Sequence, residues 1–225
     1  MKLNTDATRR VVVDTNALDW QASSLPGVWR RMLERDGEEV ARATSVVRYD
    51  PGSAIDAHEH GGGEEFLVLK GTFTDETGDY PAGSYLRNPV GSTYAPSSAE
   101  GCEVLVKLRQ MDRADQDVVR VDIHDPALEW VDGGPGTVAR AELHAFDGVR
   151  TYLARLAPGV NGVEHDHPGG EEVFVLEGEI EDDDGAYPAG TWFRLPDGSR
   201  HQPRSPKGAL LYVKVGHLMA DAFKI

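Results

Sequence analysis

Two histidines one residue apart, followed by a Pro-Gly-Gly turn and a glutamate, form the stretch of this sequence with the clearest chemical character. They are His165, His167 and Glu171, and His201 follows 34 residues after His167. Histidines at positions i and i+2 of a strand point to the same face. Three imidazoles and one carboxylate are ordinary ligands of divalent transition metals. The sequence therefore predicts one divalent metal ion held by these four side chains.

An earlier stretch repeats this pattern at a constant offset of 107 residues. His58 and His60 stand before the same kind of glycine turn, and Glu64 follows it at the start of an apolar run. The match continues without gaps for most of a domain. A repeat of this length indicates duplication of a whole domain. One position breaks it, because Tyr94 stands where the second copy has His201. The first copy therefore offers either a weaker site of two histidines and one carboxylate or a relic retained for packing.

Short apolar segments punctuated by glycine and proline surround both motifs. Residues 28–35 and 39–49 flank an Asp-Gly turn and read as the two arms of a hairpin. With 25 glycines and 13 prolines, the pattern predicts an all-β sandwich or closed barrel. The run at residues 172–176 is apolar on both faces. We expect one face to line a barrel and the other to meet the partner domain or a second subunit, which favours a homodimer.

The second motif region resembles the cupin signature. The positions that carry the resemblance are His165, His167, Glu171, Gly178, Gly190, Pro196, Gly198 and His201. Ser205 departs from the asparagine that is usual at the end of that signature. The finer pattern is similar to the ChrR-type cupin-like domain. The resemblance implies a bicupin, two tandem jelly-roll β-barrels of RmlC-like fold, with an incomplete metal motif in residues 1–113 and a complete one in residues 114–225.

The resemblance also implies two functions, between which the metal decides. ChrR-type domains include small dioxygenases, so iron(II) or manganese(II) at the four ligands would suit cleavage of a C–C bond in a small diketone or hydroxyketone. They also include the metal-binding half of zinc anti-sigma factors. Zinc would form a closed tetrahedral site, which suits a non-enzymatic sensor or regulator. Nickel is a further option for the same site, and a second ion in the first copy is an additional expectation.

Sigma-factor binding is not expected, because anti-sigma factors of this group carry a separate N-terminal helical domain with its own zinc site. This sequence opens almost directly into predicted strands. A formal net charge of −15 disfavours nucleic acids and anionic membranes as partners. A small-molecule ligand or substrate is the expected partner.

The single cysteine, Cys102, excludes an intrachain disulfide and is expected to be a buried apolar residue. No stretch approaches the roughly 18 apolar residues that a membrane span requires. The N-terminus lacks the apolar segment of a secretion signal. We therefore expect a soluble cytoplasmic protein.

Three features near the motifs have two interpretations. Glu172 is the rival of Glu171 as a ligand, but motif spacing and strand parity favour Glu171, and Glu172 is expected to pair on the surface. The acidic run at residues 181–184 is interpreted as a solvated hairpin tip rather than a calcium site. Arg87 and Arg194 are interpreted as salt-bridge residues on strands rather than as guides for an anionic substrate.

Overall fold

The computed structural model describes residues 1–132 and 139–219. Within these residues the regular elements are β-strands, apart from the single 3-10 turn η1 (Thr15–Ala17). None of the described segments is a helix with the length and hydropathy needed to cross a bilayer. The all-β expectation is confirmed.

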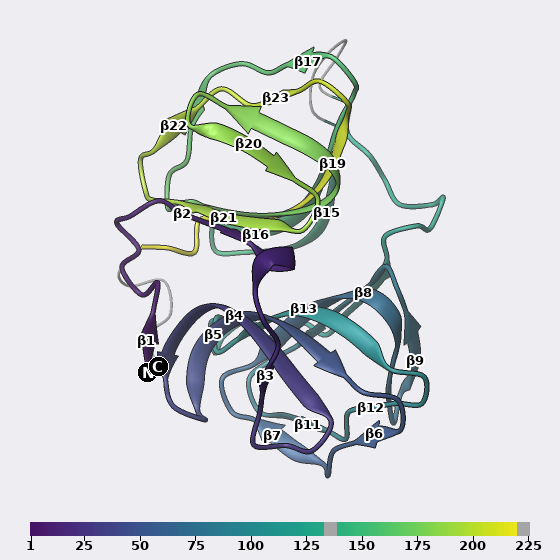
Figure 1. Ribbon diagram of the computed structural model, residues 1–225. Helices are drawn as coiled ribbons and strands as arrows, with labels where there is room; N and C mark the ends of the chain where they lie inside the picture. The colour runs from purple at the N-terminus through teal and green to yellow at the C-terminus, as the bar shows by residue number, and fades with distance from the viewer. Residues whose placement is uncertain (133–138, 220–225) are drawn as a thin grey trace. The chain divides into compact units, whose positions relative to one another are not determined.

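The chain forms two compact units (Figure 1). The first comprises Met1–Thr5 and Leu18–Pro126. The second comprises Asp6–Ala17 and the described residues from Ala127 onward. Each unit therefore contains one copy of the repeated histidine motif.

The two units exchange one strand each. A strand that precedes the main strands of one unit in the sequence pairs with the sheet of the other unit. β2 (Val11–Asp14) pairs antiparallel with β21 (Thr191–Leu195) in the second unit. β14 (Val119–Asp122) pairs antiparallel with β10 (Ser84–Asn88) in the first unit. The units thus depart from a division after residue 113 in these two exchanged segments.

The strands of the first unit form one large antiparallel sheet in the order β1-β4-β5-β13-β8-β10-β14, together with a two-stranded sheet of β7 and β11. The hairpin expected at residues 28–49 is confirmed as β4 and β5. The strands not yet given are β1 (Lys2–Leu3), β3 (Gln21–Ala22), β4 (Val28–Gly37), β5 (Ala41–Tyr49), β6 (Ser53–Ala54), β7 (His58–His60), β8 (Glu64–Asp75), β9 (Gly78–Pro81), β11 (Ser92–Tyr94), β12 (Ser97–Ser98) and β13 (Cys102–Leu108).

The second unit repeats this plan, with a large sheet in the order β15-β16-β24-β19-β21-β2 and a two-stranded sheet of β18 and β22. β19 corresponds to β8, and β24 corresponds to β13. The remaining strands are β15 (Ala139–Phe146), β16 (Val149–Leu156), β17 (Val160–Asn161), β18 (His165–Asp166), β19 (Glu171–Asp182), β20 (Gly185–Pro188), β22 (Arg200–His201), β23 (Arg204–Ser205) and β24 (Ala209–Val215).

The two apolar interiors match position by position. Phe66 and Leu86 are buried in the first unit, and their counterparts Val173 and Phe193 are buried in the second. Alternate residues of each long strand point inward, as strand geometry requires. Burial of one such side chain contributes about 1.5–3 kcal/mol, so these clusters hold the sheets together around the motifs.

Gly71 and Gly178, which close the first half of each histidine motif, lie where no side chain fits. Their φ angles are +68° and +72°, a region that only glycine enters freely. A Cβ atom would lie 2.0 Å from the carbonyl oxygen of Gly101 in one case and 1.9 Å from that of Gly208 in the other. The motif glycines are therefore required by the close approach of a neighbouring strand.

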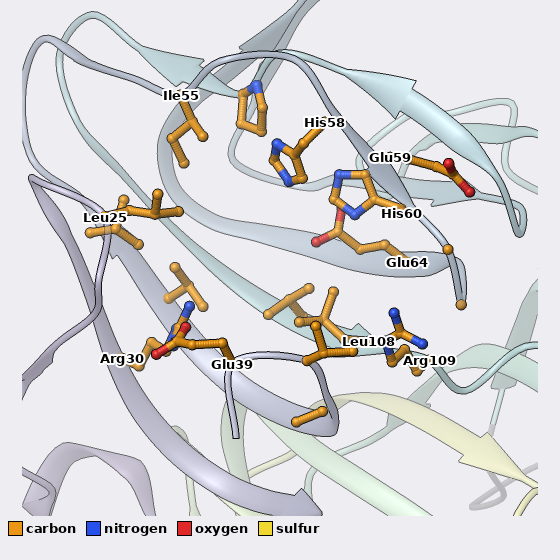
Figure 2. A pocket seen from close by; sticks show the side chains of 18 of the residues that line it. Leu25, Arg30, Glu39, Ile55, His58, Glu59, His60, Glu64, Leu108 and Arg109 are labelled. Atoms are coloured by element: carbon orange, nitrogen blue, oxygen red, sulfur yellow. The ribbon is translucent and has the colours of Figure 1, made fainter. Parts of the chain in front are cut away.

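The first unit holds a pocket of about 300 Å³. Its walls include apolar side chains of the main sheet, among them Val47 and Val106. His58, His60 and Glu64 also line it (Figure 2). The first histidine motif is thus part of a cavity large enough for a small organic molecule.

Candidate metal centre

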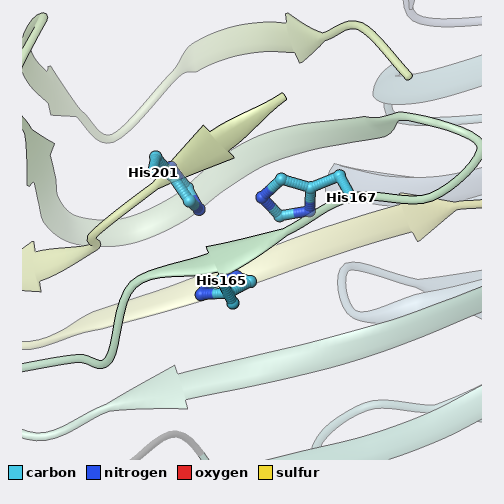
Figure 3. Close-up of side chains that lie close together, drawn as sticks. All are labelled: His165, His167 and His201. Atoms are coloured by element: carbon cyan, nitrogen blue, oxygen red, sulfur yellow. The ribbon is translucent and has the colours of Figure 1, made fainter. Parts of the chain in front are cut away.

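Three histidines of the second unit meet beside two short strands. β18 pairs antiparallel with β22, and this register places His165 opposite His201. His167 lies two residues further along the chain. One ligand nitrogen from each of the three rings lies within 4.8 Å of the other two (Figure 3). The structure thus brings together the histidines that the sequence singled out, and their role as metal ligands stays a prediction.

Glu171 faces this cluster from the first residue of β19. Its Oε2 atom is 3.6 Å from Nε2 of His167 and 3.9 Å from Nε2 of His201. The next residue, Glu172, points the other way, as strand parity predicts. The expectation that Glu172 pairs on the surface is wrong, because it is 3% exposed. Its Oε1 lies 3.4 Å from Nε2 of His217, which is also buried.

The four donors fit a cation. Nε2 of His167 and Oε2 of Glu171 are buried and have no hydrogen-bond partner in the described part of the chain. Burial lowers the pKa of His167 to about 3 and that of His201 to about 4. Burial raises the pKa of Glu171 to about 8. Neutral imidazoles offer lone pairs, and a divalent cation would stabilise the ionised carboxylate that this buried site otherwise disfavours.

A hydrogen bond on the side of the His165 ring away from the other two histidines fixes which of its nitrogens can bind a metal. Nδ1 of His165 lies 2.9 Å from the carbonyl oxygen of Val163 and donates to it as the protonated nitrogen. Its Nε2 then carries the lone pair. Partners of this kind fix the tautomer and the orientation of metal-binding histidines.

The buried carboxylate of Asp182 lies behind His201, as the carbonyl group of Val163 lies behind His165. Oδ2 of Asp182 lies 3.5 Å from Nδ1 of His201. Arg10, just before β2, donates from Nη2 to that Oδ2 at 2.7 Å, and the Tyr187 hydroxyl donates to Oδ1 at 2.8 Å. The expectation that residues 181–184 are a solvated tip is therefore wrong for Asp182, which is 6% exposed. It holds for Asp184, whose side chain is 68% exposed.

The first unit assembles the same motif with one substitution. β7 pairs with β11, and Tyr94 stands opposite His58, as His201 stands opposite His165. The Tyr94 ring stacks on His60 with the ring centroids 4.3 Å apart. Nδ1 of His60 is 3.6 Å from Oε2 of Glu64. A phenol ring thus lies against the two-histidine, one-carboxylate set, and binding of a second metal here stays a prediction.

The backbone partner of the first histidine is also repeated. Nδ1 of His58 lies 3.0 Å from the carbonyl oxygen of Asp56, and Asp56 matches Val163 at the repeat offset. Burial lowers the pKa of His60 to about 4 and raises that of Glu64 to about 8. The first unit has kept the electrostatic character of the motif.

Comparison with known proteins identifies these two units. A family model described as the ChrR cupin-like domain matches residues 8–112 and again residues 118–219. The chain belongs to the ChrR cupin-like family. It is a bicupin, as the repeat and the motifs predicted. No curated protein matches the sequence.

Solved structures with low sequence identity share the bicupin fold. A candidate dioxygenase from Nostoc punctiforme has a TM-score of 0.77 at 18% identity, covering 97% of this chain and 85% of its own. Protein YlbA from Escherichia coli has a TM-score of 0.71 at 16% identity, with 93% and 92% covered. A variant of Bacillus subtilis oxalate decarboxylase has a TM-score of 0.60 at 14% identity, with 91% and 76% covered. At these identities the likeness concerns the fold.

Two further expectations concern buried residues of the cupin domains. Arg87 pairs with the Asp115 carboxylate and donates to the carbonyl oxygen of Asp117 at 2.6 Å, so its role as a salt-bridge residue is confirmed. Arg194 is fully buried and donates to the carbonyl oxygen of Asp6 at 2.7 Å. Cys102 is buried as expected, and burial raises the pKa of its thiol to about 11.

Sequence reasoning missed Asp182 and Arg10. Asp182 stood inside a charge run, and no local spacing links it to His201. Arg10 lies 172 residues before Asp182 in the sequence, so nothing linked it to the second motif.

Proposed function

We propose that the C-terminal cupin domain holds one divalent transition metal through His165, His167, Glu171 and His201, and that the chain is a dioxygenase. The observation that supports this best is the pair of buried ligand atoms, Nε2 of His167 and Oε2 of Glu171, which lie 3.6 Å apart and make no hydrogen bond among the described residues. Both belong to a cluster with two further imidazoles. Burying such polar atoms without hydrogen bonds costs folding free energy, and a bound cation would offset that cost.

The proposed reaction cleaves a C–C bond in a small diketone or hydroxyketone. One atom of dioxygen enters each of the two carbonyl-containing products, so no external reductant is required. Iron(II) or manganese(II) at the site would supply the coordination positions and electron transfer that this chemistry needs. The candidate dioxygenase from Nostoc punctiforme has the same fold and is consistent with this proposal.

The residues of this chain have defined tasks in that proposal. His167 and His201 are neutral at pH 7 because burial lowers their pKa values to about 3 and 4. These two imidazoles therefore need not lose a proton before they donate a lone pair to a metal ion. Asp182 orients the His201 ring from behind. The apolar side chains around the motif, among them Val173 and Phe193, exclude water from the barrel interior.

The alternative function is a zinc-binding sensor or regulator. The observation that favours it is the number of protein donors, because three imidazoles and one carboxylate fill a tetrahedral zinc shell without leaving an open position. In either function we propose a small molecule as the partner. A net charge of −15 argues against nucleic acid and anionic membranes, and association into a homodimer is a further proposal.

The test is metal analysis of protein purified without chelators, followed by oxygen uptake. We expect about one iron or manganese per chain, and consumption of oxygen with acetylacetone or 2-hydroxyacetophenone. His201→Ala should remove most of the metal and the activity. His124→Ala is the matched control, because His124 is exposed in the first unit. About one zinc per chain with no oxygen uptake would favour the sensor, and full metal content in His201→Ala would refute the ligand assignment.

A further inference from the structure

We propose that the pocket of the first cupin domain binds a small organic carboxylate with an apolar body, whose carboxylate pairs with Arg109 without any metal. This site lies in a different domain from the proposed metal centre. The test of this proposal can therefore succeed or fail independently of the proposed dioxygenase function.

Arg109 has a backbone conformation that arginine seldom adopts. Its φ angle is +57°, in the left-handed region where a Cβ atom crowds the following carbonyl. The counterpart in the second domain is Gly216, with a φ angle of +81°. The first domain thus has a long cationic side chain at a position that the fold suits to glycine. Strained residues of this kind concentrate at binding sites.

The turn at Gly61 and Gly62 leaves space for the Arg109 side chain. A Cβ atom on Gly62 would lie 2.3 Å from Cγ of Arg109, so only glycine leaves room for the arginine stem. A Cβ atom on Gly61 would lie 3.7 Å from Nη2 of Arg109. The second domain has Pro168 in place of Gly61. Both the arginine and the space above Gly61 are features of the first domain.

The guanidinium of Arg109 is available to a ligand. Within the described ranges it makes no hydrogen bond or ion pair, whereas Arg30, which also lines the pocket, lies 3.7 Å from the Glu39 carboxylate. Figure 2 shows Arg109 at the end of the pocket that holds His60, with Arg30 and Glu39 at the opposite end. Glu59, which precedes this turn, also lines the pocket and is exposed to solvent.

A second polar atom is positioned for the same ligand. Nε2 of His60, whose side chain is 8% exposed, is buried without a partner among the described residues. Tyr94 covers one face of the ring, on the side where the second domain has its fourth donor. The other walls include apolar side chains, Val47 and Val106 among them, and also the polar side chains of His58 and Glu64. The pocket therefore combines the guanidinium of Arg109 and the buried imidazole of His60 with a lining that is apolar in part.

The volume of about 300 Å³ sets the size of the ligand. It lies at the lower end of the range for small-molecule pockets, which suits a monocarboxylate of roughly ten non-hydrogen atoms. Octanoate and phenylacetate are suitable probes. Octanamide and phenylacetamide have nearly the same shape without the charge, and octylamine reverses the charge.

The test is calorimetric titration of the full chain after dialysis against EDTA. We expect octanoate or phenylacetate to bind at one site, and the matching amide to bind at least about tenfold more weakly, because a charge-assisted hydrogen bond is lost. Arg109→Gly should weaken carboxylate binding by a similar factor. Glycine suits the backbone at this position, so the melting temperature should stay the same or rise. The matched control is Arg113→Ala, which removes one exposed positive charge from the same domain and should leave binding unchanged.

Several outcomes would overturn the proposal. Binding of neither carboxylate would refute it, and so would equal affinity in Arg109→Gly or tighter binding of octylamine. Carboxylate binding that requires added metal, or that disappears in His201→Ala but not in Arg109→Gly, would assign the ligand to a metal centre instead.

Discussion

Oδ2 of Asp182 lies 3.5 Å from Nδ1 of His201, on the side of the ring away from the Nε2 atom that faces Glu171. The carboxylate is itself fixed by Arg10 and Tyr187. A strand tip thus supports the last histidine of the motif. Carboxylate partners of this kind raise the basicity of a metal-binding histidine and limit its rotation.

We expect Asp182→Asn to weaken metal binding in the C-terminal domain by about 10–100-fold, because the amide cannot supply the negative charge behind His201. Competition with a coloured chelator measures the change. The matched control is Asp183→Asn, one residue further along, where the side chain is 86% exposed and pairs with Arg204. Equal affinities in the two variants would show that Asp182 does not position the histidine.

Arg10 connects the exchanged strand β2 to this carboxylate. Arg10→Ala leaves Asp182, whose side chain is 2% exposed, without its cation, so we expect a loss of about 1–3 kcal/mol in the free energy of unfolding. Urea denaturation followed by tryptophan fluorescence, to which the buried Trp192 of the second unit contributes, measures it. Arg9→Ala removes a neighbouring charge and should change the stability by no more than about 0.5 kcal/mol.

The sequence predicted the parts of this protein that depend on local spacing. His165, His167 and Glu171 could be grouped because strand parity and a short turn fix where their side chains point. The role of Asp182 could not be predicted, because its contact with His201 arises only when the end of β19 pairs with β23, a strand that follows His201 in the sequence. The same limit applied to Glu172, since its burial depends on His217, far along the chain.

The exchange of β2 and β14 was also beyond the sequence. The apolar residues at 11–13 recur in the segment 118–123. The partners of the two strands, β21 and β10, occupy equivalent positions of the duplicated domain. Repeated edges present nearly the same hydrogen-bonding pattern. Local pattern alone therefore cannot decide which copy each strand completes.

Tyr94→His would restore the fourth donor of the first domain. Tyr94 stands opposite His58 in the same register that pairs His201 with His165, so we expect metal content to rise from about one to about two ions per chain. Elemental analysis of protein loaded with excess metal and desalted measures this. Tyr94→Phe keeps the ring and adds no donor, so it should show no gain. No gain in the histidine variant would mean that the first pocket does not admit a metal.

Gly178→Ala tests the close approach that ends the first half of the motif. The new Cβ would lie 1.9 Å from the carbonyl oxygen of Gly208, and the φ angle of +72° is unfavourable for alanine. We expect a loss of at least about 2 kcal/mol in the free energy of unfolding. Gly148→Ala is the control, because its φ angle is +84° and nothing lies within 4 Å of the new Cβ. It reports the backbone cost alone, so equal losses in the two variants would exclude a steric role for Gly208.

Metal binding to the second domain should release a proton from Glu171. Burial raises the pKa of this carboxyl to about 8, so it is mostly protonated at pH 7 in the metal-free protein and must ionise to act as a ligand. His167 and His201 release none, because their pKa values are about 3 and 4. The affinity should therefore rise by up to about tenfold per pH unit towards pH 8 and level off above it. Calorimetry at pH 7.5 in two buffers of different ionisation enthalpy gives the proton count, and the release should vanish near pH 9.5. A release that is absent at pH 7.5 would mean that Glu171 is already ionised and that the site is more polar than its burial indicates.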